Sequence, residues 1–308
     1  MGQKWCRQER VKGGADVTIE IGLAGWGDHD DLYEAGTKPG DKLKVYGEHF
    51  PVVEVDSTFY AIQSRDRFAK WVQDTRDSLQ FVVKAYGGMT GHQRGGSGKG
   101  EQGDMAEAFK RMLEPAIESG RLTAVLFQYP PWFDCNSHHV KLLKYTKQRM
   151  EGIPCALEFR HASWFEGEMR ERTLAFMEEE GWIHGVCDEP QAGMGSIPTV
   201  LKATTRDVTI VRMHGRNVAG WNAASAPNWR EVRYLYRYSE AELTEWRDKL
   251  IELERQCGRV CVIFNNNSGG DAADNAKELM EMLGQKRPDG SDPIAQPSPP
   301  DVEQLELF

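Results

Sequence analysis

The chain has 308 residues, a length that suits one large domain or two smaller ones. Its 38 Lys and Arg residues are outnumbered by 47 Asp and Glu residues, and this net charge of -9 argues against a protein whose whole surface coats nucleic acid or an anionic membrane. No apolar stretch approaches the roughly 18 residues of a membrane span, and six cysteines without a CxxC pair are typical of a reduced, cytoplasmic protein.

Residues 1–17 form the first recognisable segment of the chain. They are polar, contain several glycines and show no periodicity, so we expect a disordered leader. An alternative interpretation is that this leader is not native and that translation begins at Val17. In both interpretations, the globular part of the protein starts after it.

Eight short apolar runs follow, and most of them precede an amphipathic stretch of helical length. This alternation predicts a buried parallel sheet covered by helices. Eight repeats predict a single-domain α/β protein, a (β/α)8 TIM barrel over residues 18–284. The runs are Thr18–Trp26, Val52–Tyr60, Gln80–Tyr86, Thr123–Pro130, Cys155–Trp164, Trp182–Asp188, Val208–Arg216 and Arg259–Asn267.

Helices are expected between these runs, with polar residues as their N-caps. The sixth crossover, Glu189–Asp207, is rich in Gly and Pro and predicts a loop with little helix. Two further segments, Gly87–Gly103 and Val218–Arg237, are expected to be long loops on the catalytic face of the barrel. The expected helices are Arg65–Thr75, Met105–Glu118, His139–Met150, Glu166–Glu180, Glu240–Arg255 and Ala272–Leu283, and the expected caps are Ser64, Asp104, Ser137 and Ser239.

Polar side chains gather where the apolar runs end, and in a TIM barrel these ends form the site. Side chains two residues apart on a strand point the same way, which predicts a converging set of charges and amides. Lys84, Arg160, Arg212 and Arg216 give this set an excess of cations, which favours an anionic ligand such as a phosphate ester or carboxylate. The other expected ligand-binding residues are Asp56, Thr58, Gln128, Asn265 and Asn267.

Catalytic roles are expected for three of these strand-end residues. His214 is the natural general acid or base, because its unperturbed pKa lies near neutrality. Lys84 is expected to clamp the anion, and Glu158 is expected to orient Arg160 or to act as a partner base. No cofactor is predicted.

Two alternatives use the same residues differently. In the first, Glu158–Arg160 and Asp56–Arg212 are structural ion pairs that close the barrel mouth. In the second, Glu158, Asp188 and His214 on three consecutive strands bind a divalent metal, as in an isomerase or hydrolase. Arginines beside the second set would repel a cation, so we expect no metal.

Aromatic residues also cluster at the ends of the runs. They could form a stacking wall for a sugar or a base, although simple packing accounts for each one equally well. They are Trp26, Tyr60, Tyr129, Trp132 and Trp164.

Seven segments together resemble the DUF72 family of YecE-like proteins, and residues 18–33 look most like its YunF-type branch. The resemblance runs from Ile19 to about Leu283 and implies a TIM barrel but no particular reaction. The segments are Gly22–Trp26, Val53–Tyr60, Phe81–Ala85, Leu126–Pro131, Glu158–Trp164, Arg212–Arg216 and Phe264–Asn267. The rim residues that match are Thr58, Tyr60, Lys84, Gln128, Glu158, Arg160, His161, Trp164, Arg212, His214 and Asn265.

The tail, residues 285–308, differs in composition from the rest of the chain. Its prolines predict an extended, disordered spacer. The final five residues, QLELF, are similar to the short peptide that binds the bacterial DNA sliding clamp, although Glu306 stands where Ser or Asp is more usual. The resemblance implies Gln304, Leu305, Leu307 and Phe308 as clamp-binding residues. The alternative is that these apolar residues fold back onto the barrel.

The sequence therefore predicts an enzyme that acts on an anionic ligand, phosphorylated or derived from nucleic acid. The alternatives are a metal-dependent isomerase or hydrolase, and a clamp-associated protein that binds a ligand without turnover. No membrane partner is expected.

We expect the purified chain to bind the bacterial sliding clamp through its tail, because two or three apolar anchors on a flexible spacer can dock with little further ordering. Surface plasmon resonance with immobilised clamp tests this, with a chain lacking residues 304–308 as the control. Equal signals from the full and truncated chains would contradict the clamp assignment.

Overall fold

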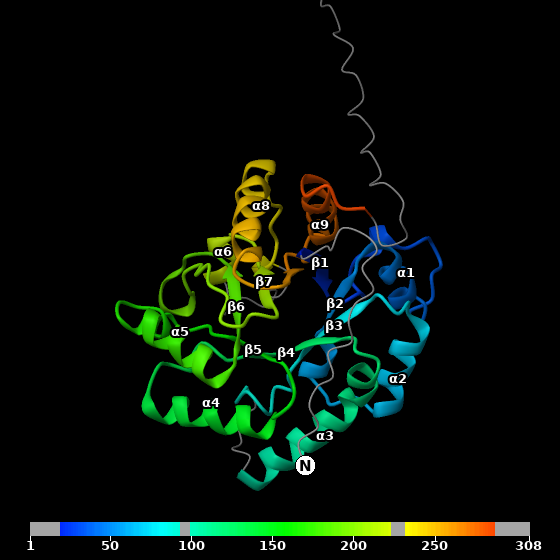
Figure 1. Cartoon of the computed structure of the whole chain (residues 1–308). Coiled ribbons are helices and arrows are strands. Elements are labelled where there is room, and N and C mark those ends of the chain that lie inside the picture. Colours follow the sequence, from blue (N-terminus) through cyan, green and yellow to red (C-terminus); the bar gives the residue numbers. More distant parts are fainter. Residues whose placement is uncertain (1–18, 93–98, 223–231, 287–308) are drawn as a thin grey trace, which may run out of the picture.

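The computed structural model describes residues 19–92, 99–222 and 232–286, so the expected leader and tail lie outside the described residues. Eight parallel strands close into a barrel in sequence order, and helices surround it (Figure 1). The predicted TIM barrel is therefore confirmed. The strands are β1 Ile19–Ala24, β2 Val52–Val55, β3 Gln80–Lys84, β4 Leu122–Gln128, β5 Cys155–Glu158, β6 Ile183–Asp188, β7 Thr209–Met213 and β8 Val260–Phe264.

Alternate residues of each strand face the inside of the barrel, where apolar side chains fill its lower and middle layers. Val52 and Val82 belong to this interior cluster, and the positions two residues further along, Glu54 and Lys84, carry charge. The opposite strand faces pack against the helices in a second and larger cluster. The strands therefore bring charge to the carboxyl end of the barrel. The interior cluster contains Ala24, Val52, Val82, Ala124, Leu126, Ala156, Ile183, Val208, Ile210, Cys261 and Ile263.

The helices match the predicted alternation, and two of the expected caps are confirmed. Ser64 accepts a hydrogen bond from the Arg67 N–H, and Ser239 forms a complete capping box with Glu242. Within the described ranges, no helix is long and apolar enough to cross a membrane. The helices are α1 Lys42–His49, α2 Arg65–Asp74, α3 Lys99–Glu118, α4 Ser137–Arg149, α5 Met169–Glu180, α6 Val218–Asn222, α8 Glu240–Glu254 and α9 Asp271–Met282.

Several local predictions were wrong. The α1 helix was missed, since it is short and has no side-chain cap. The α3 helix begins at Lys99, so Asp104 lies inside it, and α4 is capped by Asn136 one residue before the expected Ser137. The α6 helix lies in a segment expected to be a loop. The predicted loop of the sixth crossover is confirmed, because only the 3-10 turn Gly193–Gly195 interrupts it.

A tight contact joins the first two strands. The Tyr46 hydroxyl accepts a hydrogen bond from the Leu23 N–H and donates one to the Val52 carbonyl, both at 2.8 Å. Gly22 lies directly against this contact, and a Cβ atom there would stand 1.9 Å from the Val52 oxygen. Only a glycine allows β1 and β2 to pair at this point.

Replacing Gly22 with Ala should therefore destabilise the fold by at least 1–3 kcal/mol, roughly the cost of overpacking a core. The matched control is Gly40→Ala, because an added Cβ at Gly40 meets no atom within 4 Å. Urea unfolding followed by circular dichroism measures both. Equal urea midpoints for the two variants would contradict this expectation, because they would show that β1 and β2 accommodate the added Cβ atom without loss of stability.

Candidate functional site

A pocket of about 850 Å³ opens at the carboxyl ends of the strands. Residues from strands or following loops at β1, β2, β3, β4, β5, β7 and β8 line it, as expected for the catalytic face of a TIM barrel. The lining residues are Gly27, Asp28, Asp30, Asp31, Glu54, Asp56, Phe59, Tyr60, Lys84, His92, Gln128, Pro131, Arg160, Arg212, Arg233, Tyr234, Asn265, Asn267, Ser268 and Gly270.

Arg212 anchors the floor of this pocket. It is 1% exposed and donates two hydrogen bonds to Glu54, from Nε at 2.8 Å and from Nη2 at 2.7 Å. Its Nη1 reaches Glu158 at 2.9 Å. The expected Asp56–Arg212 pair is therefore wrong: Glu54, two residues earlier on β2, binds the guanidinium instead. Such a bidentate pair holds the guanidinium in one orientation and also compensates its charge.

Arg160 continues this network on the next side of the barrel. Its Nε donates to Glu158 at 2.7 Å, which confirms the expected Glu158–Arg160 pair, and its Nη1 donates to Glu189 at 2.6 Å. Glu189 also accepts the Ile197 N–H at 2.7 Å. We call Glu54, Glu158, Arg160, Glu189 and Arg212 the buried charge network.

The network removes most of the expected cation excess. Three glutamates surround two arginines within it, so Arg160 and Arg212 have little charge left for a ligand. Burial raises the pKa of Glu189 to about 7, so the third carboxylate is only partly ionised near neutral pH. Burial alone would raise the pKa of Glu158, but Arg160 and Arg212 outweigh it and lower that pKa to about 2. Glu158 is therefore a poor base at neutral pH.

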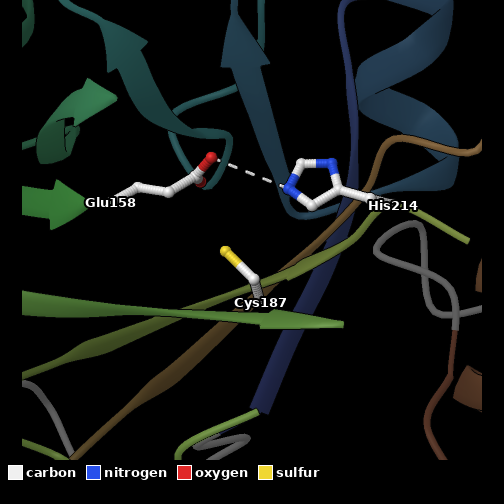
Figure 2. Close-up of side chains that lie close together, drawn as sticks. All are labelled: Glu158, Cys187 and His214. Carbon is white, nitrogen blue, oxygen red and sulfur yellow. Dashed lines mark ion pairs between the residues drawn. The ribbon is translucent and has the colours of Figure 1, made fainter. Parts of the chain in front are cut away.

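His214 lies beneath the pocket rather than in its lining. Figure 2 shows its ring facing the Glu158 carboxylate, with Nε2 3.7 Å from the nearer oxygen. An arginine can only donate, so His214 Nε2 accepts the 2.8 Å hydrogen bond from Arg160 Nη2. Burial, Arg160 and Arg212 all lower the pKa of His214 well below its usual value, which keeps the ring neutral. This geometry argues against the predicted acid or base role of His214.

The neutral ring has a defined tautomer. Because Nε2 accepts a hydrogen bond, the ring proton is on Nδ1, which faces the Asn265 amide at 2.9 Å. The atom 2.9 Å from Nδ1 is the amide nitrogen Nδ2 of Asn265, which cannot accept a hydrogen bond. The Nδ1–H tautomer therefore requires the opposite orientation of the amide, in which its oxygen accepts from Nδ1. His214 therefore connects the buried charge network to the pocket residue Asn265.

The metal alternative needs Asp188 beside Glu158 and His214, and the structure does not bring them together. Asp188 faces outward from β6, where it accepts hydrogen bonds from Tyr238 Oη at 2.7 Å and from Arg216 Nε at 3.0 Å. Its neighbour Cys187 faces inward instead, since adjacent strand residues alternate.

Glu158, Cys187 and His214 do lie close together, with candidate ligand atoms within 4.8 Å of one another (Figure 2). A divalent cation does not fit them, because Glu158 and His214 already bind the Arg160 guanidinium. Burial and Glu158 raise the pKa of the Cys187 thiol well above its usual value, so the thiol stays protonated. A metal ligand must instead be a thiolate.

Lys84 and Asp56 differ from the network in that they face the pocket without a paired partner. Among the described residues, neither side chain forms an ion pair or a side-chain hydrogen bond, and Lys84 Nζ lies 4.9 Å from the centre of the Phe59 ring. Burial and Glu54 raise the pKa of Asp56, while burial and Arg212 lower the pKa of Lys84. Both groups are therefore moved toward titration nearer neutrality.

The pocket also contains residues that the sequence analysis did not select. Arg233 and Tyr234 come from the segment before α8, His92 follows β3, and Asp28 and Asp31 follow β1. No periodic pattern marks them, because they belong to irregular segments. The presence of Arg and Trp residues in Val218–Arg237 was the available signal for Arg233, whose guanidinium lies 3.9 Å from the Trp221 ring centre.

Of the predicted ligand-binding residues, several line the pocket and five do not. Those in the lining are Asp56, Tyr60, Gln128, Arg160, Arg212, Asn265 and Asn267. Trp26 packs on Trp71, and the Thr58 hydroxyl binds the carbonyls of Val55 and Lys84. The other three are His161, which caps the 3-10 helix Ala162–Trp164; Trp164, which stacks on Phe159; and Arg216, which pairs with Asp188, Glu242 and Glu245.

These five side chains lie outside the pocket lining for a shared physical reason. Strand alternation holds only while the chain stays extended, and it ends at a left-handed glycine or a 3-10 turn. Gly25 and Gly215 have φ of 74° and 82°, and they precede Trp26 and Arg216. Thr58 lies in the 3-10 helix Ser57–Phe59.

Comparison with known proteins identifies the family. Residues 20–300 match the family described as "Protein of unknown function DUF72". The UPF0759 protein YunF of Bacillus subtilis (strain 168) is 55% identical over 266 residues, which cover 86% of this chain and 94% of that protein. The chain therefore belongs to the DUF72 family.

Solved structures of the family have the same fold. A DUF72 family protein from Enterococcus faecalis V583 is 33% identical, with a TM-score of 0.80 over 87% of this chain and 96% of the other. One from Thermotoga maritima MSB8 is 31% identical, with a TM-score of 0.73 over 87% of this chain and 100% of the other.

Replacing Glu158 with Gln should destabilise the protein by about 3–5 kcal/mol at pH 7, because two buried arginines lose their shared partner. The pKa of Glu158 is lower in the folded state than in the unfolded state, so its contribution to stability is full above about pH 4.5 and is lost as the pH falls toward about 2. The difference between wild type and variant should shrink over this range in urea unfolding.

The control is Glu118→Gln, since Glu118 has one exposed ion pair among the described residues, with Arg65 at 3.5 Å. That variant should change the free energy of unfolding by less than about 1 kcal/mol. Equal effects of the two substitutions would contradict a coupled network.

Proposed function

We propose that this DUF72 family protein is an enzyme that moves a proton on a small anionic ligand, with Asp56 as the base and Lys84 as the cation that stabilises the oxygen on which negative charge develops. The ligand binds in the pocket above the buried charge network. The proposal rests on Asp56 and Lys84: they are ionisable groups of opposite charge that face the pocket without ion-pair partners among the described residues.

The two groups suit proton transfer because of their surroundings. A carboxylate with a raised pKa is a stronger base than an ordinary aspartate, and burial and Glu54 raise the pKa of Asp56. In the proposed step a ligand C–H beside a carbonyl gives its proton to Asp56. The carbonyl oxygen gains the electron pair and accepts a hydrogen bond from the Lys84 ammonium. Return of the proton to a carbon completes an isomerisation or epimerisation.

The anionic group of the ligand has a candidate partner in Arg233. This arginine lines the pocket and forms no ion pair with any carboxylate in the described part of the chain. Its contact with the Trp221 ring holds the guanidinium plane in place. Because Arg160 and Arg212 are neutralised by glutamates, one anionic group is favoured over a polyanion.

The opposite side of the pocket favours a small hydroxylated ligand. Asp28, Asp30 and Asp31 on the β1 side repel a phosphate polymer, and their carboxylates accept hydrogen bonds from hydroxyl or amino groups. Gln128 and Asn267 add amide donors and acceptors. Single-molecule ligands, including nucleotides released from nucleic acid, fit this lining better than a nucleic acid strand does.

The clamp-binding tail remains a separate proposal, since residues 304–308 lie outside the described residues. Clamp binding by the tail would give the barrel a place in DNA metabolism. The pocket chemistry proposed above does not depend on it.

Proton transfer can be tested without knowing the physiological substrate. We expect the protein to exchange a carbon-bound hydrogen of some phosphorylated keto or aldo sugar for deuterium in D2O, measured by proton NMR over a panel of such compounds. Asp56→Asn and Lys84→Met should each lower the exchange rate by at least about 100-fold. Lys70→Met, at an exposed surface ion pair with Asp74, is the matched control.

The pH profile of this exchange has an expected shape. The rate should rise as Asp56 ionises above its raised pKa and fall as Lys84 loses its proton above its lowered pKa. The bell should therefore be narrower than the span of about 3.9 to 10.4 between the two unperturbed pKa values. Exchange that survives in Asp56→Asn would contradict the proposed base.

A further inference from the structure

A row of aromatic side chains in mutual contact lies on the β2 to β4 side of the pocket. Phe59 lies beside Lys84, and it contacts Tyr60 and His92 edge to face at centroid distances of 5.3 Å and 4.9 Å. His92 in turn contacts the Trp132 ring at 6.0 Å. We call Phe59, Tyr60, His92 and Trp132 the aromatic ledge.

The outer end of the ledge is unusually open to solvent. Tyr60 is 68% exposed and Trp132 is 55% exposed, although both belong to residue types that normally bury much of their surface. Tyr60 and His92 line the pocket, and Trp132 follows the lining residue Pro131. The exposed rings therefore continue the pocket surface rather than forming a separate patch.

The pocket is larger than one sugar requires. Its volume of about 850 Å³ lies high in the range of roughly 300–1,000 Å³ that holds drug-sized ligands. The aromatic ledge lies next to Asp56 and Lys84, on the β2 to β4 side of the pocket. A ligand with its reacting carbon between these two groups can therefore extend over the ledge.

We propose that the aromatic ledge binds a nucleobase and that the ligand class is a nucleoside monophosphate derivative whose sugar carries a carbonyl group; AMP and UMP share its base and phosphate but cannot react. This inference rests on the proposed function for the position of the anionic group and the sugar. Stacking on Tyr60 and Trp132 would bury both exposed rings, and an aromatic side chain accepts any base because every base has a π-face. The carboxylates of Asp28 and Asp30 accept hydrogen bonds from ribose hydroxyls or exocyclic amino groups.

His92 has the chemistry that a base-binding surface needs. Burial, Lys84 and Arg160 lower the pKa of His92 to about 4, so the ring is neutral at physiological pH. Its Nδ1 lies 2.8 Å from the Thr90 hydroxyl, which fixes the ring orientation. A neutral ring adds no further cation at this end of the pocket.

Isothermal titration calorimetry with four probes tests the inference: ribose 5-phosphate, AMP, UMP and sucrose 6-phosphate. We expect AMP and UMP to bind at least about tenfold more tightly than ribose 5-phosphate, the size of effect that base stacking provides. Tyr60→Ala and Trp132→Ala should each remove this difference, so that AMP and UMP bind no more tightly than ribose 5-phosphate does. Leu235→Ala, at another exposed apolar residue, is the control.

The outcomes separate this inference from the proposed function. Arg233→Gln should weaken ribose 5-phosphate and AMP by the same factor. Equal affinities for AMP and ribose 5-phosphate in wild type would overturn the base assignment while the anion site stands. A different outcome is that sucrose 6-phosphate alone binds more tightly than ribose 5-phosphate and loses this gain in Tyr60→Ala and Trp132→Ala. This result would show that the ledge binds a sugar ring, and it would also overturn the base assignment. No Arg233-dependent binding of any probe would overturn both proposals.

Discussion

Two arginines placed inside a barrel are the constraint on which the rest of this structure depends. Arg160 and Arg212 are nearly inaccessible to water, and an isolated charge there would be prohibitively costly. Three glutamates from β2, β5 and the residue after β6 compensate them, with donor–acceptor distances of 2.6 to 2.9 Å. Because these partners come from strands far apart in sequence, the network forms only when the barrel closes.

The network also determines which neighbouring groups can take part in proton transfer. It holds Glu158 ionised and His214 neutral, so neither group can easily exchange protons with a ligand near neutral pH. Lys84 and Asp56 lie at the edge of this network and face the pocket. Their pKa values are moved by burial and by the charges below them. The proposed proton transfer rests on this arrangement, in which a paired floor lies beneath two groups whose pKa values are displaced from their usual range.

Much of this arrangement could be predicted from the sequence. Period-two alternation within an extended strand correctly directed Lys84, Gln128, Arg160, Arg212 and Asn265 to the pocket. It could not decide which carboxylate binds Arg212, since Glu54 and Asp56 share one face and only three-dimensional distance separates them. The sequence prediction also misplaced Asp188, because on β6 the side chain of Cys187 points into the barrel and that of Asp188 points outward. Every residue of β6 is buried, so the sequence does not show which of its alternate side chains face the interior.

Other parts of the site could not be predicted from local pattern at all. Arg233 and His92 lie in irregular segments, where no periodicity connects a residue to a direction. Thr58 and Arg216 follow points where a 3-10 turn or a left-handed glycine ends the strand, so the alternation that selected them no longer applied. Tertiary contacts determine which way the side chains of such residues point.

Asp56 and Lys84 face the pocket above the paired floor, and among the described residues neither has an ion-pair partner, which is the premise of the proposed proton transfer. A pH titration by carbon NMR tests it most directly, with the Asp56 carboxyl and Lys84 ε-carbon signals assigned by their loss in Asp56→Asn and Lys84→Met. We expect Asp56 to titrate above the usual value of about 3.9 and Lys84 to titrate below the usual value of about 10.4. An Asp56 pKa below 3.9 together with a Lys84 pKa above 10.4 would show that the two side chains pair with each other, and would contradict it.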